Sequence, residues 1–145
     1  MADLTVLINE KITLDGNDRG VLTTQTITGV NGIDNRILTI PTGSHTGLFY
    51  FADNNIDAAV FPTSSFKYGR ITNKSSVPVQ LVVSTADGNY SDFIVPPGNS
   101  FFLSSTSATG SLADSTNFTF GTYVSEILVA PSGSPALIEY FIATV

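Results

Sequence analysis

The sequence lacks cysteine and tryptophan, has one histidine, and carries only six Lys and Arg against twelve Asp and Glu in 145 residues. Without cysteine there can be no disulfide and no thiolate metal site, so the core must hold by packing alone. The acidic balance disfavours phosphate backbones, and we expect no nucleic-acid partner. Only Met1, Ala2 and Asp3 precede the first apolar run, and no run approaches the roughly 18 residues of a membrane span. We therefore expect a soluble chain without a signal peptide or a membrane partner.

Short runs of β-branched and aromatic residues follow one another along the chain. They lie at 4–9, 11–15, 21–28, 36–40, 47–52, 66–72, 77–84, 92–95, 100–104, 123–130 and 136–144. Turn clusters separate them, namely DGND, GVNG, PTGS, ADNN, ADGN, PPGN and PSGSP. Helical periodicity is absent, and NIDAAVF (55–61) fits a single helical turn or a loop. The pattern predicts an all-β protein, an antiparallel β-sandwich of about ten short strands that is jelly-roll-like. We expect one domain over residues 1–145, with residues 1–20 as an arm or an edge strand.

Alternation within the strands indicates which faces are buried. In VPVQLVVS, residues 77, 79, 81 and 83 are apolar and share one face, which predicts a core face. The last strand, ALIEYFIAT, is largely apolar on both faces. Such a strand is either central and buried on both sides, or part of a subunit contact. At the corner RITNKSS, Asn73 and Ser75 can hydrogen-bond the turn backbone.

The residues that usually carry catalysis are scarce. His45 lies in the turn PTGSHTG, where a surface position is expected, and GSHTG has histidine where a nucleophile elbow needs serine. Paired carboxylates remain a catalytic option, because glycoside hydrolysis needs only two acids at the right separation. The candidate pairs are Asp15 with Asp18, Asp53 with Asp57, Asp87 with Asp92, and Glu126 with Glu139. The first three pairs lie in turns, where Asp is expected for backbone capping alone, and exposure to solvent is the expected state of Glu126 and Glu139. We expect no enzyme, no cofactor, no metal site and no small-molecule substrate.

Three segments resemble a pattern found in small virion structural proteins of tailed bacteriophages, particularly those of aquatic bacteria. They are FKYGRITNKSSVPVQLVVS, DFIVPPGNSFFLSS and NFTFGTYVSEILVAPSGSPALIEYFIAT. The shared elements are the R-I-T-N strand at 70–73, the P-x-G-x-S-F entry at 97–101 and the closing I-E-Y-F-I-A at 138–143. The opening VLINEKITLDGNDRG is also similar to the start of such chains. These motifs are structural and cover most of the chain.

The resemblance implies a structural protein of the virion, assembled in the host cytoplasm, without giving its place on the particle. Within this class we expect a capsid decoration or cement protein. Its expected partners are the major capsid protein or another virion protein, and itself, commonly as a homo-trimer. Within this interpretation the chain contributes contact residues rather than a reactive site, because aromatic side chains dominate protein interfaces. The candidates are Phe49, Phe51, Tyr123, Tyr140 and Phe141, with Arg70 pairing across the interface with Glu126 or Glu139.

Two other functions stay open. One is a tail, neck or fibre component that contacts the host surface through exposed Tyr and Asn in loops. The other is a carbohydrate-binding module or a carboxylate-dependent glycosidase. Phe49, Tyr50 and Phe51 are consecutive, so at least one ring must point away from the other two.

Overall fold

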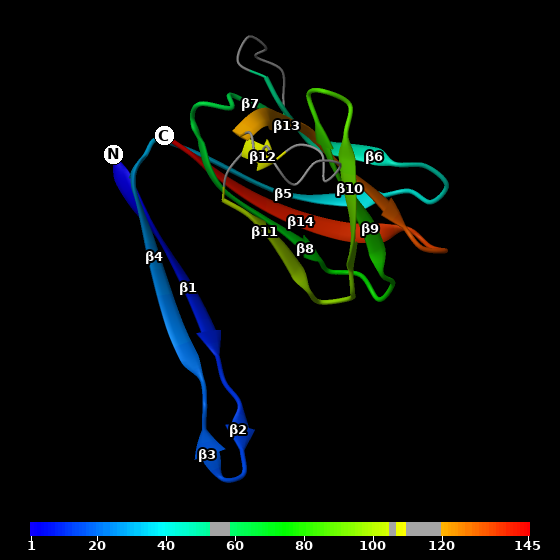
Figure 1. Cartoon of the computed structure of the whole chain (residues 1–145). Coiled ribbons are helices and arrows are strands. Elements are labelled where there is room, and N and C mark those ends of the chain that lie inside the picture. Colours follow the sequence, from blue (N-terminus) through cyan, green and yellow to red (C-terminus); the bar gives the residue numbers. More distant parts are fainter. Residues whose placement is uncertain (53–58, 105–106, 110–119) are drawn as a thin grey trace, which may run out of the picture.

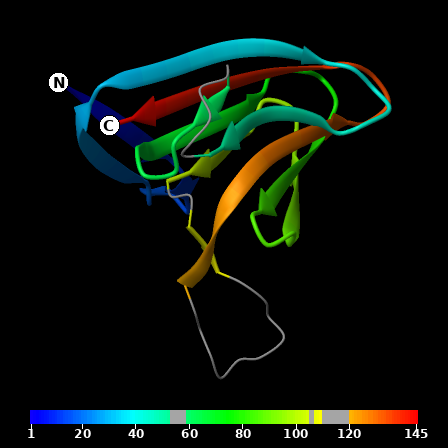
Figure 2. The same cartoon turned by 90° about the horizontal axis from the view of Figure 1, so that it is seen from above.

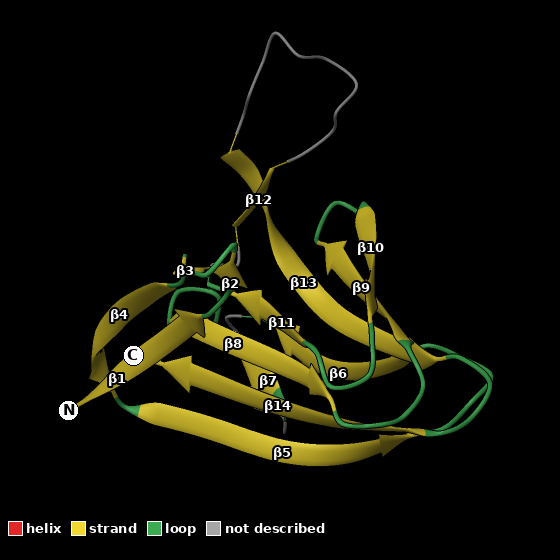
Figure 3. Cartoon of the chain, turned by 90° about the horizontal axis from the view of Figure 1, so that it is seen from below, coloured by secondary structure: helices red, strands yellow, loops and turns green. Residues whose placement is uncertain are grey.

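The computed structural model describes residues 1–52, 59–104, 107–109 and 120–145, and its account of side chains omits 107–109 and 120–123. Every regular element in this part of the chain is a β-strand (Figure 3). Two sheets pack face to face, as Figure 2 shows from above, so the predicted all-β sandwich is confirmed. The jelly-roll connectivity stays a prediction. Among these residues there is no helix with the length and apolar character needed to cross a membrane.

The larger sheet has six strands. Its order is β10 (Tyr90–Val95), β9 (Val79–Thr85), β13 (Phe120–Pro131), β6 (Thr46–Phe51) and β7 (Val60–Phe61), and β12 (Ser107–Thr109) also pairs with β13. All of its pairings are antiparallel except the short β6–β7 pair. The smaller sheet has the order β11 (Ser100–Leu103), β8 (Phe66–Asn73), β14 (Ala136–Thr144) and β5 (Gly32–Ile40), all antiparallel.

The core lies between the two sheets. Val79 and Leu81 of β9 are buried, and Val77 and Val83 pack against the same cluster, which confirms the alternation predicted for this strand. The phenyl ring of Phe49 meets several aromatic rings edge-on, with centroid distances of 5.6 Å to Phe51 and 5.4 Å to Tyr140. Edge-to-face packing of this kind adds to the free energy gained by burying the ring area.

The buried side chain of Asn73 stabilises one corner of the sandwich. Asn73, at the end of β8, is fully buried, and its Nδ2 donates to the carbonyls of Val77 (2.8 Å) and Val95 (3.0 Å). Its Oδ1 accepts from the backbone N–H of Ser75 at 3.0 Å and also from the Ser75 hydroxyl. Since β8 belongs to one sheet and Val95 ends a strand of the other, Asn73 joins the two sheets. The sequence predicts only the local bonds to the turn.

The last strand, β14, lies centrally in its sheet, between β8 and β5. Its inner face is fully buried, as expected for a central strand. Its outer face is only partly covered: Ala143 is buried beneath other apolar residues, whereas Leu137 is exposed. The expected central position is therefore confirmed, burial on both sides holds only for part of the strand, and a subunit contact on the outer face stays a prediction.

An arm extends from the sandwich (Figure 1). It consists of β1 (Ala2–Glu10) paired antiparallel with β4 (Val21–Val30), and its tip is the short hairpin of β2 (Thr13–Leu14) and β3 (Asn17–Asp18). Asp15 and Gly16 connect the tip strands with φ angles of 51° and 77°. Positive φ at both central residues of a two-residue loop defines a type I′ turn, for which Asp-Gly is a favoured sequence. The arm therefore reaches beyond the expected residues 1–20 and includes β4.

Candidate interaction surfaces

The outer face of the four-stranded sheet is the first candidate surface. Strand alternation turns Ile138, Tyr140 and Ile142 of β14 into the core, so Leu137, Glu139 and Phe141 face outward. The strand register places residues of β5, β8 and β11 beside them on this face. Its exposed apolar side chains are Ile33 (63% exposed), Ile37 (57%), Phe102 (50%) and Leu137 (39%). We call this surface the outer sheet face.

An ion-pair network lies in the middle of the outer sheet face. Arg70 Nη2 donates to Glu139 Oε1 at 2.6 Å, and Lys74 Nζ donates to Glu139 Oε2 at 3.2 Å. The Lys74 hydrogen bond, with the positive charges of Lys74 and Arg70, holds the pKa of Glu139 below its usual value although burial opposes this. The buried Nε of Arg70 has no hydrogen-bond partner among the described residues. Arg70 therefore has a buried donor that none of the described residues accepts from.

The arm is the second candidate surface. Paired residues of an antiparallel ribbon share a face, so Ile8 and Val21 lie on one face of the arm and Leu7 and Leu22 on the other. These four side chains are between 45% and 63% exposed. Ile12 and Leu14, toward the tip, are also more than half exposed. A two-stranded ribbon in water is marginally stable at best, because neither face has a core to bury.

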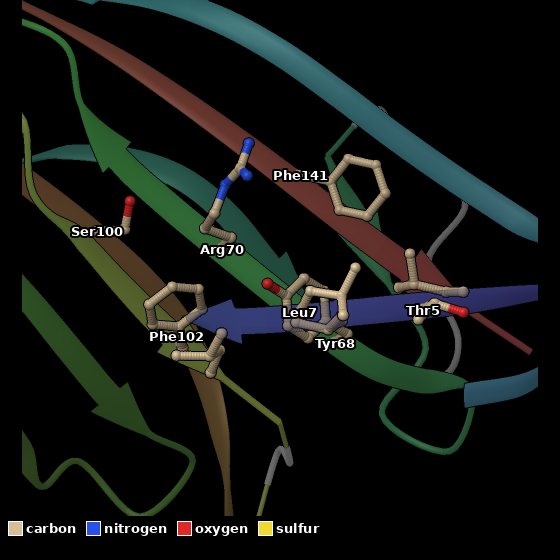
Figure 4. Close-up of a pocket in the computed structure, with 10 residues that line it drawn as sticks. Thr5, Leu7, Tyr68, Arg70, Ser100, Phe102 and Phe141 are labelled. Carbon is tan, nitrogen blue, oxygen red and sulfur yellow. The ribbon is translucent and has the colours of Figure 1, made fainter. Parts of the chain in front are cut away.

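The root of the arm is anchored on its own chain. Leu4, Val6 and Ile27 pack against a small cluster formed by Val30, Tyr68 and Ala143. Beyond this cluster the arm and the outer sheet face enclose an open cleft of about 500 Å³. Figure 4 shows its lining, in which Thr5 and Leu7 come from β1, Tyr68 and Arg70 from β8, and Phe102 and Phe141 from β11 and β14.

Charge is distributed unevenly between these parts of the chain. The arm carries four acidic side chains against two basic ones, namely Asp3, Glu10, Asp15 and Asp18 against Lys11 and Arg19. The four-stranded sheet and the residue that follows β8 have the opposite balance, with Arg36, Lys67, Arg70 and Lys74 against Asp34 and Glu139. Strands β6, β7, β9, β10 and β13 contain no Lys or Arg. An acidic arm is therefore attracted to the four-stranded sheet and not to the six-stranded one.

Three of the predicted interface anchors are core residues. Phe49, Phe51 and Tyr140 are at most 3% exposed, so they offer no surface to a partner, and that expectation is wrong for these rings. The reason is strand alternation: of the three consecutive aromatics 49–51, two face the core and Tyr50 faces outward, 41% exposed. Tyr140 faces the core for the same reason, and its hydroxyl donates to Asp34 Oδ2 at 3.2 Å. Burial, with the nearby Asp34 charge, raises the pKa of Tyr140 to about 12.

The other predicted residues lie in different places. Phe141 and Arg70 are on the outer sheet face and line the cleft. Arg70 and Glu139 do pair, but within one chain and between neighbouring strands, rather than across an interface. Glu126 lies on the outer face of the six-stranded sheet, on the opposite side of the sandwich from Glu139, so these two carboxylates do not face each other. Tyr123 is in β13, and its side chain falls outside the described part of the structure.

The outer face of the six-stranded sheet carries a polar cluster. His45 Nε2 lies 3.2 Å from Gln80 Oε1, and Gln80 Nε2 donates to Asp92 Oδ2 at 2.9 Å. Tyr90, 70% exposed, borders the same shallow hollow of about 390 Å³. The predicted surface position of His45 agrees with its exposure. Among the described residues no group of three or more His, Cys, Asp and Glu side chains could hold a metal ion, and the pair Asp53 and Asp57 lies outside them.

The sequence reasoning missed the apolar residues of the arm. LTVLIN and KITL were assigned as strands, yet no exposed contact residue was predicted in either. The signal was present, because LTVLIN places Leu4, Val6 and Ile8 on one face and still has Leu7 on the other. A pattern that is apolar on both faces indicated either a central strand or a subunit contact for the last strand, and it applies equally to LTVLIN.

Comparison with known proteins gives no match: no family model and no curated protein matches the sequence, and no solved structure matches the fold. Function must therefore be argued from the surfaces themselves.

Proposed function

We propose that this chain is a structural subunit of a bacteriophage virion, a capsid decoration or cement protein that binds neighbouring shell subunits and acts without catalysis. The observation that carries the proposal is the arm, which leaves a well-packed sandwich and exposes apolar side chains on both of its faces. A surface of this kind is costly in water and is normally covered by another protein. The sequence resemblance to small virion proteins supports the same class. The shell partner would be the major capsid protein, and the protein's location would be the virion, assembled in the host cytoplasm.

The direct test is the composition of purified particles from a phage that encodes this sequence. We expect mass spectrometry to find the protein at a fixed ratio to the shell protein, and antibody labelling to lie on the head. Recombinant protein added to heads that lack it should bind at that ratio and raise the temperature at which they rupture. Absence of the protein from particles, or labelling confined to the tail, would contradict the decoration role.

A second candidate function is recognition of host glycans by a tail or fibre component, and the polar cluster on the six-stranded sheet favours it. Asp92, Gln80 and His45 offer acceptors and donors for sugar hydroxyls, and Tyr90 offers an exposed ring beside them. A ligand that binds only the folded protein raises its melting temperature. We expect any stabilising oligosaccharide in a thermal-shift screen to lose its effect in Tyr90→Ala. A screen without hits would leave this function unsupported.

A further inference from the structure

The arm and the outer sheet face are unpartnered surfaces on different parts of the same chain. The arm exposes apolar residues on two faces, Leu7 and Leu22 on one and Ile8 and Val21 on the other. Its root packs on the sandwich through Leu4, Val6, Ile27 and Val30. In the part of the chain that the structure describes, no other element packs over the outer half of the arm, as Figure 1 also shows.

The outer sheet face offers the exposed apolar side chains and the hydrogen-bond donor that an apolar, acidic arm could contact. It presents Ile33, Ile37, Phe102 and Leu137 to solvent. Between them lies Arg70, whose side chain is partly exposed and donates to Glu139. A β-ribbon laid on this face would bury apolar area on both sides of the contact, and its carbonyl or carboxylate oxygens could approach the arginine.

Charge favours contact of the arm with the outer sheet face over contact with the outer face of the six-stranded sheet. The arm has two more acidic than basic side chains. The ion-pair network of the outer sheet face has two cations, Arg70 and Lys74, for one carboxylate, Glu139. Arg36 and Asp34 do not belong to this face, because the register pairs them with Tyr140 and Ile142, which face inward. The strands of the six-stranded sheet other than β12 carry only acidic charges, at Asp92 and Glu126. An arm from another copy is therefore attracted to one face of the sandwich and repelled from the other.

We propose that the arm of one copy lies across the outer sheet face of a second copy, so that the chain forms a closed homo-oligomer by exchanging its hairpin. Because the two surfaces differ, the contact is either reciprocal in a dimer or head-to-tail in a ring. Either arrangement covers one apolar face of each arm and leaves the opposite face for another partner. The inference concerns contacts between copies and does not depend on the virion role.

The first experiment measures the mass of the full-length chain by light scattering at micromolar concentration. Wild type should be an oligomer. Ile12→Lys combined with Leu14→Lys on the arm, and separately Ile37→Asp on the outer sheet face, should each weaken self-association about tenfold or more, because each places charge in an apolar contact and reduces the charge attraction between the two surfaces. The matched control is Ile94→Asp, at a residue that is 68% exposed on the six-stranded sheet, and it should remain an oligomer. Far-UV circular dichroism checks that each variant is folded.

The second experiment identifies the contact itself and does not require charged variants to fold. The chain has no cysteine, so single cysteines report without background. A Leu14→Cys chain with a large tag is co-expressed with an untagged Ile37→Cys chain and treated with a flexible bismaleimide. We expect a cross-linked product that contains both chains, and much less of it when Ile94→Cys replaces Ile37→Cys. Linkage between two chains excludes an arm that folds back on its own sheet.

Three results would overturn the proposal. They are a wild-type monomer at 100 µM or above, an oligomer that the arm variant leaves unchanged, and equal cross-linking at Ile37→Cys and Ile94→Cys. A monomer that still binds phage heads would end the exchange model and leave the decoration role intact. An oligomer that is absent from particles would contradict the decoration role and leave the exchange model intact.

Discussion

Asn73 is predicted to be the most sensitive polar position in the chain. Its side chain makes four hydrogen bonds, to the carbonyls of Val77 and Val95 and to the backbone and hydroxyl of Ser75. Each such bond contributes about 0.5–1.5 kcal/mol net, and losing a partner leaves a buried carbonyl without a donor. Asn73→Ala should therefore lower the free energy of unfolding by about 3–5 kcal/mol, a large share of the roughly 5–15 kcal/mol that stabilises a domain.

The assay is urea and thermal unfolding, followed by far-UV circular dichroism and tyrosine fluorescence, since the chain has no tryptophan. A loss of this size should lower the melting temperature by about 10 °C in a chain of this length. Asn99→Ala is the matched control, because the Asn99 side chain is exposed and bonds only the nearby carbonyl of Pro97. If Asn73→Ala unfolds within about 1 kcal/mol of wild type, Asn73 does not hold the two sheets together.

Three further predictions test the core and the ion pairs. The pKa of Tyr140 is raised to about 12, so unfolding frees an easily ionised phenol, and stability should fall by about 2–3 kcal/mol between pH 10 and pH 12. Tyr140→Phe should flatten that decline in alkaline denaturation curves, and an unchanged slope would refute the assignment. Phe49→Ala should cost about 3–5 kcal/mol in urea unfolding through a core cavity, whereas Ile94→Ala should cost well under 1 kcal/mol; similar losses would place Phe49 outside the core. Glu139→Gln should cost less than about 1 kcal/mol at pH 7. Because the folded pKa of Glu139 is lowered, wild type loses this stability as the pH falls below about 4.5, and the variant should show a shallower acid decline.

The sequence determined the fold class and much of the core, because strand and turn chemistry is local. Period-two alternation marked Val79 and Leu81 as buried, and the DGND cluster marked the turn at the tip of the arm, although not its type. It also indicated that Asn73 and Ser75 would bond the corner. These features depend on residues close together in the chain, which is why a single sequence predicts them.

Only the tertiary structure decided which apolar side chains stay exposed. Phe49, Phe51 and Tyr140 have the composition of interface anchors, yet the phase of each strand turns them inward. Leu7, Leu22 and Ile37 have the same apolar character, but they lie on a ribbon and a sheet face that no second layer covers. Arg70 was expected to pair across an interface with Glu126 or Glu139, whereas it pairs with Glu139 of its own chain. The sequence could not decide this, since 69 residues separate the partners and the β8–β14 register brings them together. Burial depends on which surface packs over which, and that is fixed by contacts between strands far apart in the chain.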